Sequence, residues 1–306
     1  MIRDVLQQVS GERIRRDLFY LCRDPLPFRK VNYTRPGQSV NSLAEADVFI
    51  RGQLESAGYG VTTTTYRVQP FRCDSTKPLH HWYSAPEPSD PTFDAANLEA
   101  TRPGCTRPEE IIQLIAHKDS MSWIDSPGAH DNAVGTVANL ELARVLATCT
   151  LHRSVRLLFC NEEHTPWTSV TAAKNIKEAG LDVLALINLD AVGGKSADKS
   201  GRLINVTRFT TPEGERLADL NKRLNDRFSI GLEQSKYRSE DPGDDDGSFI
   251  KAGFPWAVLN IGSMPYSDPN YHLETDTPEK VDYDTAEKVV SLTLALILHL
   301  DLNGRP

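Results

Sequence analysis

The sequence predicts an α/β fold, a three-layer sandwich in which a central mixed, mostly parallel β-sheet is flanked by helices. Several apolar runs, such as "IIQLIA" and "VRLLFC", lack the alternation of apolar and polar residues that a half-exposed strand shows. Such continuous runs are typical of strands buried on both faces. They alternate along the chain with helical patterns, as the strands of a parallel sheet do. At 306 residues, with 39% hydrophobic and 25% charged residues, the chain is long enough to bury the large core that this fold needs.

The first third of the chain contains two predicted helices and one predicted strand. Helix patterns cover 4–20 and 42–57, and the second closes on Gly58 and Gly60, where a C-cap glycine is expected. The strand "GVTTTTYRV" follows. Residues 70–108 are rich in Pro, Ser, Asp and Thr, so we expect a long excursion or an edge segment there rather than a core element.

From residue 111 onward, strands and helices alternate regularly. The expected strands are the runs "IIQLIAHKDS", "VRLLFCNEE", "LDVLALINLDAVGG" and "FPWAVLNIG". The last helix has Asp284 available as its N-cap and Glu287 at the capping-box position. The helical spacing of apolar residues predicts the accompanying helices, which cover 133–148, 168–179, 212–227 and 284–300.

Charge and hydropathy narrow the classes of partner. A net charge of −8 without a run of basic residues argues against a nucleic-acid partner, because phosphates need clustered Lys and Arg. No stretch approaches the roughly 20 apolar residues that span a bilayer, so we expect no membrane association. The start of the chain lacks the apolar core of a signal peptide, which predicts a cytoplasmic protein unless the chain is the processed form of a secreted one.

Histidines and carboxylates follow the core strands at the points where these strands end. The run "IIQLIA" leads into His117 and Asp119, "VRLLFC" leads into Glu162 and Glu163, and "LALIN" reaches Asp190. Ligand sites in parallel sheets lie beyond the carboxyl ends of the strands. These side chains should therefore meet at one edge of the sheet.

Two loop residues complete the set, Asp131 in "SPGAHDNAVG" and His272 in "NYHLETDTPEK". Imidazole and carboxylate ligands without a cysteine suit a zinc-type catalytic centre, which keeps positions open for water and substrate. A pair of ions roughly 3.5–4 Å apart needs an acid that bridges them, and Asp131 is the candidate. His117 with Asp190 would then complete one ion, and Glu163 with His272 the other.

The two adjacent glutamates receive different roles. Neighbouring side chains on an extended chain point to opposite faces, so if Glu163 points at the metal, Glu162 stands beside the metal-bridging water and accepts its proton as general base. The metals lower the pKa of that water toward about 7, which lets a carboxylate act on it at neutral pH. Asp119 lies on the same strand face as His117 and can accept a hydrogen bond from the ring nitrogen that does not bind the metal.

Five motifs resemble, in this order, the co-catalytic zinc aminopeptidase family of leucyl-type and bacterial secreted aminopeptidases, whose wider group includes glutaminyl cyclases. They are "AHKDS", "SPGAHDNAVG", "LLFCNEEH", "INLDAVGG" and "YHLETDTPEKVD". The likeness extends to "LCRDPLPFRKV", "FIRGQLESAGYGV" and "DDGSFIKAGFPWAVL", so it covers most of the chain and implies one zinc-exopeptidase catalytic domain over 1–306. It implies Glu162 as general acid and base, a cis peptide between Asp131 and Asn132, and five zinc ligands, His117, Asp131, Glu163, Asp190 and His272.

The chain also departs from that family. Where relatives often read Ser-Asp-His, it has "DDDGSF", with Asp245 at the position of the shared acid and Asp246 where a His is common. His130 stands where an acid is frequent, ahead of the bridging position. We expect four histidines to be solvated or structurally hydrogen-bonded, His80, His81, His130 and His164. We expect three tryptophans to be packing residues rather than pocket walls, Trp82, Trp123 and Trp167.

Three functions fit these residues. The predicted one is a metal-dependent aminopeptidase that hydrolyses the N-terminal peptide bond of peptides with a free N-terminus, and it needs two zinc ions because one helps to hold the amine while both polarise the water and the carbonyl. The alternatives are a glutaminyl-peptide cyclotransferase with a single zinc, and a catalytically inactive relative that serves as a binding module. Metal stoichiometry separates the first two, and activity on aminoacyl arylamides separates both from the third.

Overall fold

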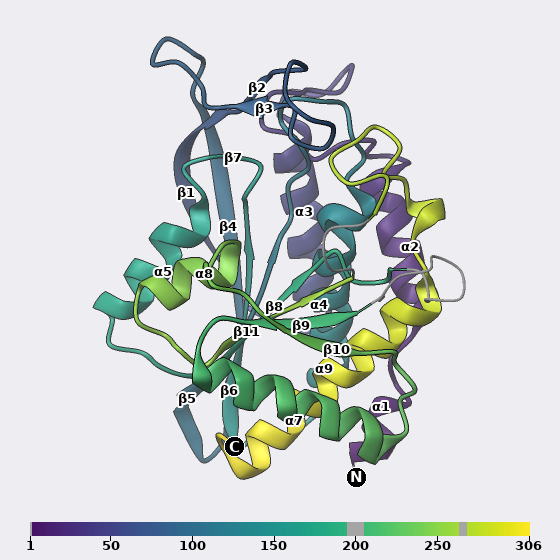
Figure 1. Ribbon diagram of the computed structural model, residues 1–306, viewed down its shortest axis with the longest axis vertical. Coiled ribbons are helices and arrows are strands. Elements are labelled where there is room, and N and C mark those ends of the chain that lie inside the picture. Colours follow the sequence, from purple (N-terminus) through teal and green to yellow (C-terminus); the bar gives the residue numbers. More distant parts are fainter. Residues whose placement is uncertain (1, 195–204, 263–267) are drawn as a thin grey trace.

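A mixed β-sheet forms the centre of the molecule (Figure 1). The structure, a computed structural model, describes residues 2–194, 205–262 and 268–306. A separate short pair is formed by β2 (Arg72–Cys73) and β3 (Tyr83–Ser84). Within the described residues the strands of the main sheet are β1 (Val61–Pro70), β4 (Phe93–Arg102), β5 (Arg107–His117), β6 (Arg153–Cys160), β7 (His164–Thr165), β8 (Asp182–Asp190), β9 (Val206–Phe209), β10 (Ser235–Arg238) and β11 (Ala257–Ile261).

The strands in the middle of this sheet run parallel. The strand order is β10-β9-β11-β8-β5-β6-β4-β1-β7. β11 pairs with β8, β8 with β5, and β5 with β6, each in parallel register. β4, β1 and β7 extend the sheet beyond β6 in antiparallel register, and β9 is antiparallel to β11 but parallel to β10. The mixed, mostly parallel sheet that the apolar runs predict is confirmed.

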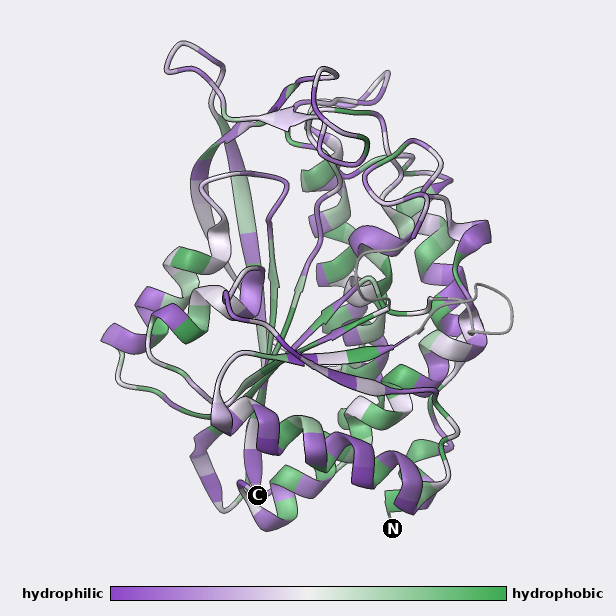
Figure 2. Ribbon diagram, viewed as in Figure 1, coloured by the Kyte–Doolittle hydropathy of each residue, from purple (hydrophilic) through white to green (hydrophobic). Residues whose placement is uncertain are grey.

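Helices cover both faces of the sheet and complete the three-layer sandwich. Successive residues of a strand point to opposite faces, so β5 contributes Leu114 to the larger core and Ile115 to the smaller one. Figure 2 shows the apolar residues gathered along the central strands and on the helix sides that face them. None of the helices in the described segments combines the length and the apolar character of a membrane span. One face carries α2 (Gly11–Cys22), α3 (Ser42–Ser56), α4 (Val134–Leu146), α7 (Pro212–Phe228) and α9 (Tyr283–Asn303), and the other carries α5 (Thr168–Glu178) and α8 (Asp245–Lys251).

The first predicted helix is divided in two. The pattern over 4–20 predicts one helix, but the structure has α1 (Ile2–Leu6) and then α2. Ser10 is the N-cap of α2, and its hydroxyl oxygen accepts a hydrogen bond from the amide of Arg13 at 3.3 Å. A serine favours the start of a helix over its interior, because its hydroxyl competes for nearby backbone groups.

The N-cap of the last helix also differs from the prediction. Asp282, not Asp284, caps α9, and its carboxylate accepts from the amide of Thr285 at 3.0 Å. Glu287 does not close a capping box on its own helix. Its carboxylate accepts from the amide of Gly11 at 2.8 Å, so it satisfies a donor at the start of α2.

The segment 70–108 holds a core strand that its composition does not predict. β4 lies between β6 and β1, and its residues Ala95, Leu98 and Ala100 are buried. The prediction of an excursion or edge segment is therefore wrong for this strand, because small residues give a weak apolar signal even where neighbouring strands cover them. It holds for 71–92, which contains only the short strands β2 and β3.

Candidate metal centre

Three neighbouring strands end where the sequence places its histidine and carboxylates. His117 is the last residue of β5, Asp190 is the last residue of β8, and Glu162 and Glu163 follow the end of β6. These strands are parallel neighbours, so their carboxyl ends meet at one edge of the sheet. Asp131 reaches this edge from the short helical turn η1 (Ala129–Ala133), directly before α4.

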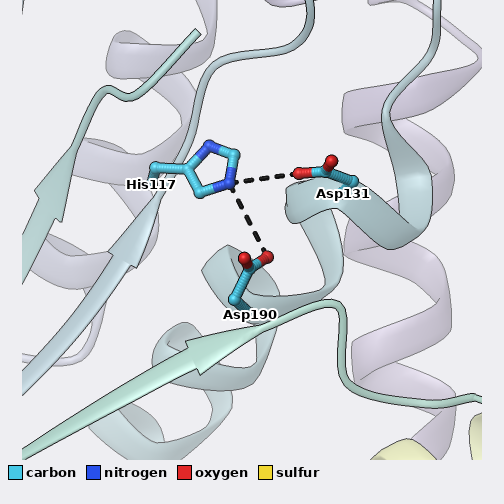
Figure 3. Close-up of side chains that lie close together, drawn as sticks. All are labelled: His117, Asp131 and Asp190. Atoms are coloured by element: carbon cyan, nitrogen blue, oxygen red, sulfur yellow. Dashed lines mark ion pairs between the residues drawn. The ribbon is translucent and has the colours of Figure 1, made fainter. Parts of the chain in front are cut away.

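His117, Asp131 and Asp190 form the first group of candidate ligands. The Nε2 atom of His117 lies 3.2 Å from Oδ1 of Asp131 and 3.6 Å from Oδ1 of Asp190 (Figure 3). All three side chains are buried. Each offers one ligand atom, and these atoms lie within 4.8 Å of one another, which leaves room for one ion among them.

Asp131 belongs to a second group as well, together with Glu163 and His272. Its other oxygen, Oδ2, lies 3.2 Å from Nε2 of His272, and that nitrogen lies 3.8 Å from Oε1 of Glu163. His272 stands shortly before the short helix η2 (Pro278–Lys280). Asp131 thus turns one carboxylate oxygen to each group, as an acid that bridges two ions must. The structure brings all five candidate ligands together.

The hydrogen bonds of the two imidazoles show that a cation fits each group. Nδ1 of His272 lies 2.7 Å from the carbonyl oxygen of His80, which can only accept, so this nitrogen carries a proton. Nδ1 of His117 lies 3.2 Å from Oδ1 of Asp119 in the same way. In the neutral ring, Nε2 then turns a lone pair toward carboxylate oxygens, and a divalent cation makes that arrangement attractive. Nitrogen and oxygen ligands of this kind suit Zn²⁺.

The pKa values of these groups reflect their burial and their mutual charges. Burial raises the pKa of Glu163 to about 8, and the charge of Asp131 adds to this rise. Burial also raises the pKa of Asp190. Burial alone would lower the pKa of His117, but hydrogen bonds with Asp119 and Asp131 outweigh it and raise that pKa well above its ordinary value. Protons and metal ions compete for the same atoms, so a metal bound here would displace these protons.

Asp119 orients more than the ring of His117. Besides its bond with Nδ1 of that ring, its carboxylate accepts from the amide of Glu162 at 3.0 Å and from the amide of Glu163 at 2.8 Å. The side chain is buried, and one acid therefore fixes the ends of two neighbouring strands relative to each other. The sequence indicates only the contact with the imidazole, because the other two partners lie more than 40 residues away.

Glu162 and Glu163 face different groups. Glu163 is buried within the second group of candidate ligands, whereas Glu162 is partly exposed and lies near Asp244 and Asp245. Burial raises the pKa of Glu162 well above its ordinary value, and these two acids raise it further. Its Oε2 atom has no hydrogen-bond partner among the described residues. The Glu162 carboxylate is therefore available to take up a proton beside the candidate ligands.

Asp276 holds the backbone of the bridging acid. Its carboxylate accepts from the amide of His130 at 2.9 Å and from the amide of Asp131 at 3.0 Å. The peptide bond between Asp131 and Asn132 is cis, as the family resemblance implies. The side-chain oxygen of Asn132 accepts from the amide of Gly135 at 3.0 Å. Asp276 was not identified from the sequence, although it stands within the motif "YHLETDTPEKVD".

A buried arginine ties the loop that follows His117 to the loop that precedes Asp131. The guanidinium of Arg29 donates to the carbonyl oxygens of Lys118 and Gly128, each at 2.7 Å. The side chain is 0% exposed. Arg29 thus fixes the spacing of the two loops, a role that its motif "LCRDPLPFRKV" does not reveal because the partners are distant in the chain.

His130, His164 and Trp123 lie close to this centre. His130 is structurally hydrogen-bonded, as expected, with Nδ1 2.8 Å from Oδ2 of Asp268. His164 is buried rather than solvated. Trp123 packs, as expected, but its ring centroid lies 5.1 Å from that of His272 with the planes at 83°, so it packs against a candidate ligand.

The acids of "DDDGSF" lie at the start of α8, and Asp244 and Asp245 are close to Glu162. The thiol of Cys160 donates to Oδ2 of Asp245 at 3.1 Å. Arg208 donates to Oδ1 of Asp246 at 3.1 Å, and both acids are buried. The position where relatives often carry a His therefore holds one half of a buried ion pair.

The fold is similar to those of solved aminopeptidases and glutaminyl cyclases. An aminopeptidase from Aneurinibacillus sp. strain AM-1 matches with a TM-score of 0.73 and 16% identity, covering 100% of this chain and 97% of that one. A glutaminyl cyclase from an Acidobacteriales bacterium matches with a TM-score of 0.71 and 18% identity, covering 97% of this chain and 96% of that one. At such identities the likeness shows the fold alone.

Similarities in sequence identify the family. A probable leucine aminopeptidase of Trichophyton verrucosum is 26% identical over 238 residues, which are 71% of this chain and 60% of that protein. A probable zinc metalloprotease of Pyricularia oryzae is 25% identical over 247 residues, 65% of this chain and 48% of that protein, so the chain spans about half the length of the curated relatives it matches. The model of peptidase family M28 matches residues 97–297, which is most of the chain. The resemblance carried by the five motifs is thereby confirmed, and the chain belongs to peptidase family M28.

Proposed function

We propose that the protein is a zinc-dependent aminopeptidase, which binds two ions at the candidate metal centre and uses them to hydrolyse the N-terminal bond of peptides. The observation that carries this proposal is the carboxylate of Asp131, whose Oδ1 faces His117 and whose Oδ2 faces His272. A single ion would need only one of these two groups. The names of the curated relatives, a leucine aminopeptidase and a zinc metalloprotease, support the same activity.

The candidate ligands divide between two ions through Asp131. His117 and Asp190 would hold one ion, and Glu163 and His272 would hold the other. When bound, the ions polarise the carbonyl of the scissile bond and lower the pKa of water toward about 7. The buried ligands and their fixed imidazole tautomers would hold both ions without rearrangement of the side chains.

Glu162 would move the proton that the reaction requires. Glu162 follows the end of β6 and precedes Glu163 in the chain, and its carboxylate belongs to neither group. It accepts a proton from the attacking water as the new C–O bond forms, and passes this proton to the peptide nitrogen as the C–N bond breaks. Asp119 keeps Glu162 in position through its bond with the Glu162 amide.

Glutaminyl cyclisation is the competing function, because solved glutaminyl cyclases share this fold. That reaction with a single zinc would use one group of ligands and leave the other without an ion. The first group, in which His117 faces both Asp131 and Asp190, therefore favours hydrolysis with two ions.

Elemental analysis of the purified protein, combined with a panel of aminoacyl arylamides, tests this proposal. We expect two zinc ions per chain and release of the arylamine from substrates with a free amine. The matched N-acetylated arylamide should remain intact, since it lacks that amine. One zinc per chain, with cyclisation of N-terminal glutamine and no hydrolysis, would identify a cyclase. A protein inactive on both kinds of substrate would be a binding relative.

A further inference from the structure

The segment 71–92, between β1 and β4, reaches the candidate metal centre. The carbonyl oxygen of His80 accepts the hydrogen bond from Nδ1 of His272 at 2.7 Å. The amide of Phe71 donates to the hydroxyl of Ser122 at 2.9 Å, which fixes the start of the segment. The composition of this segment predicts only an excursion from the core, but the segment contacts the candidate ligand His272.

Tyr83, on β3 of this segment, is held by rings at the same centre. Its ring centroid lies 4.8 Å from that of Trp123 and 5.5 Å from that of Phe71. It lies 5.7 Å from the ring of His272, with the planes at 80°. Edge-to-face contacts of this kind restrict the orientation of a ring. Tyr83 and Trp123 thus form an aromatic wall beside His272.

The hydroxyl of Tyr83 belongs to a ring that packs against the candidate ligand His272. None of the residues that the structure describes forms a hydrogen bond with this hydroxyl. The phenol of a tyrosine has an ordinary pKa of about 10. The phenol keeps its proton at neutral pH and can donate a hydrogen bond, whereas ionised carboxylates only accept.

We propose that Tyr83 is a further catalytic residue, whose hydroxyl donates a hydrogen bond to the carbonyl oxygen of the scissile peptide bond. This role rests on the proposed aminopeptidase function. The carbonyl oxygen gains negative charge as water adds to the carbonyl carbon, and a donor already held by packed rings stabilises that charge without reorganisation. The neighbouring carboxylates of Asp131, Glu162 and Glu163 cannot supply this donor while they are ionised. The phenol keeps its proton throughout.

The substitution Tyr83→Phe removes the hydroxyl and keeps the ring that packs against Trp123. We expect kcat on leucine p-nitroanilide to fall by about 10²- to 10³-fold, the usual effect of losing one such donor, with KM and zinc content unchanged. Affinity for L-leucine phosphonic acid, a tetrahedral anion that mimics the reacting carbonyl, should fall by a similar factor, while affinity for L-leucine is retained. Tyr20→Phe is the matched control, because Tyr20 is a partly exposed tyrosine on α2, 36% exposed.

The outcomes of this comparison are distinct. Equal kcat values for Tyr83→Phe and Tyr20→Phe would overturn the role of Tyr83. A higher KM with unchanged kcat would overturn it too, because it would mean that the hydroxyl binds the ground state as strongly as the transition state. A wild-type protein without activity on any arylamide would refute the proposed function itself, so the two failures can be told apart.

Discussion

Exchanging each of the two adjacent glutamates for glutamine should separate proton transfer from metal binding. Glu162→Gln keeps the shape of the side chain, and no described residue is hydrogen-bonded to its Oε2 atom. The amide of Glu162 keeps its bond with Asp119, because the backbone is unchanged. We therefore expect full zinc content and a kcat lower by about 10²- to 10⁴-fold, the usual cost of losing a general base.

Glu163→Gln should act on the metal as well as on the rate. Glu163 is buried, and its Oε1 atom lies 3.8 Å from Nε2 of His272 within the second group of candidate ligands. The exchange replaces an anionic ligand by a neutral amide. Loss of a residue that merely supports a ligand typically costs about 10- to 100-fold in metal affinity, so loss of the ligand charge should cost at least about that much. Excess zinc should restore part of the activity.

The assay measures zinc content and arylamide turnover for both variants, with and without excess zinc. Thermal unfolding of each variant serves as the control that the fold is retained. The result that would refute the reasoning is a Glu162→Gln protein without zinc beside a Glu163→Gln protein that keeps it. Base and ligand would then be reversed.

Further predictions concern the metal, its supporting residues and the core. Excess chelator should abolish arylamide hydrolysis, and zinc or cobalt should restore it, because no serine or cysteine nucleophile pattern stands in the sequence; turnover by verified metal-free protein would contradict this. Asp119→Ala, which removes the acceptor for the His117 ring, should weaken zinc binding by about 10- to 100-fold in competition with a chromophoric chelator, and unchanged affinity would exclude the supporting role. Arg29→Lys should lower kcat, because lysine cannot span both loops. The control Arg153→Lys, at the start of β6, should lower only the midpoint of thermal unfolding. Equal kcat values for the two variants would count against a positioning role for Arg29. Leu114→Ala, at 0% exposure in the larger core, should lower the free energy of unfolding by about 2–5 kcal/mol in a denaturant titration, and a loss well below that range would mean that the core closes over the gap.

The sequence predicts the central strands well because burial on both faces leaves a strong local signal. Runs such as "VRLLFC" consist mainly of apolar residues. The structure places these runs at β5, β6, β8 and β11. β4 escapes prediction because its buried positions Ala95 and Ala100 carry little apolar weight. The break between α1 and α2 escapes because Ser10 and Gly11 interrupt an otherwise helical pattern by only a few residues.

The supporting contacts of the centre escape sequence reasoning for another reason. The partners of Arg29 at Lys118 and Gly128 are backbone carbonyls 89 and 99 residues away, and a carbonyl has no sequence signature. His80 reaches His272 in the same way, through its own carbonyl oxygen across a separation of 192 positions. Residue types cannot reveal such bonds, because every residue carries the same backbone groups.

By itself, the sequence determined which side chains arrive at the edge of the sheet. Each motif directly follows a buried apolar run, and parallel strands end at a common edge, so His117, Glu163 and Asp190 had to come near one another. Only the tertiary structure decided what each atom faces. Asp131 turns one carboxylate oxygen to each group of ligands, and Tyr83 packs against His272 from the segment 71–92, whose sequence pattern predicts no core element. Periodicity records burial within a few neighbouring residues, whereas the direction of a side chain in a loop depends on contacts with residues far away in the chain, which local patterns do not encode.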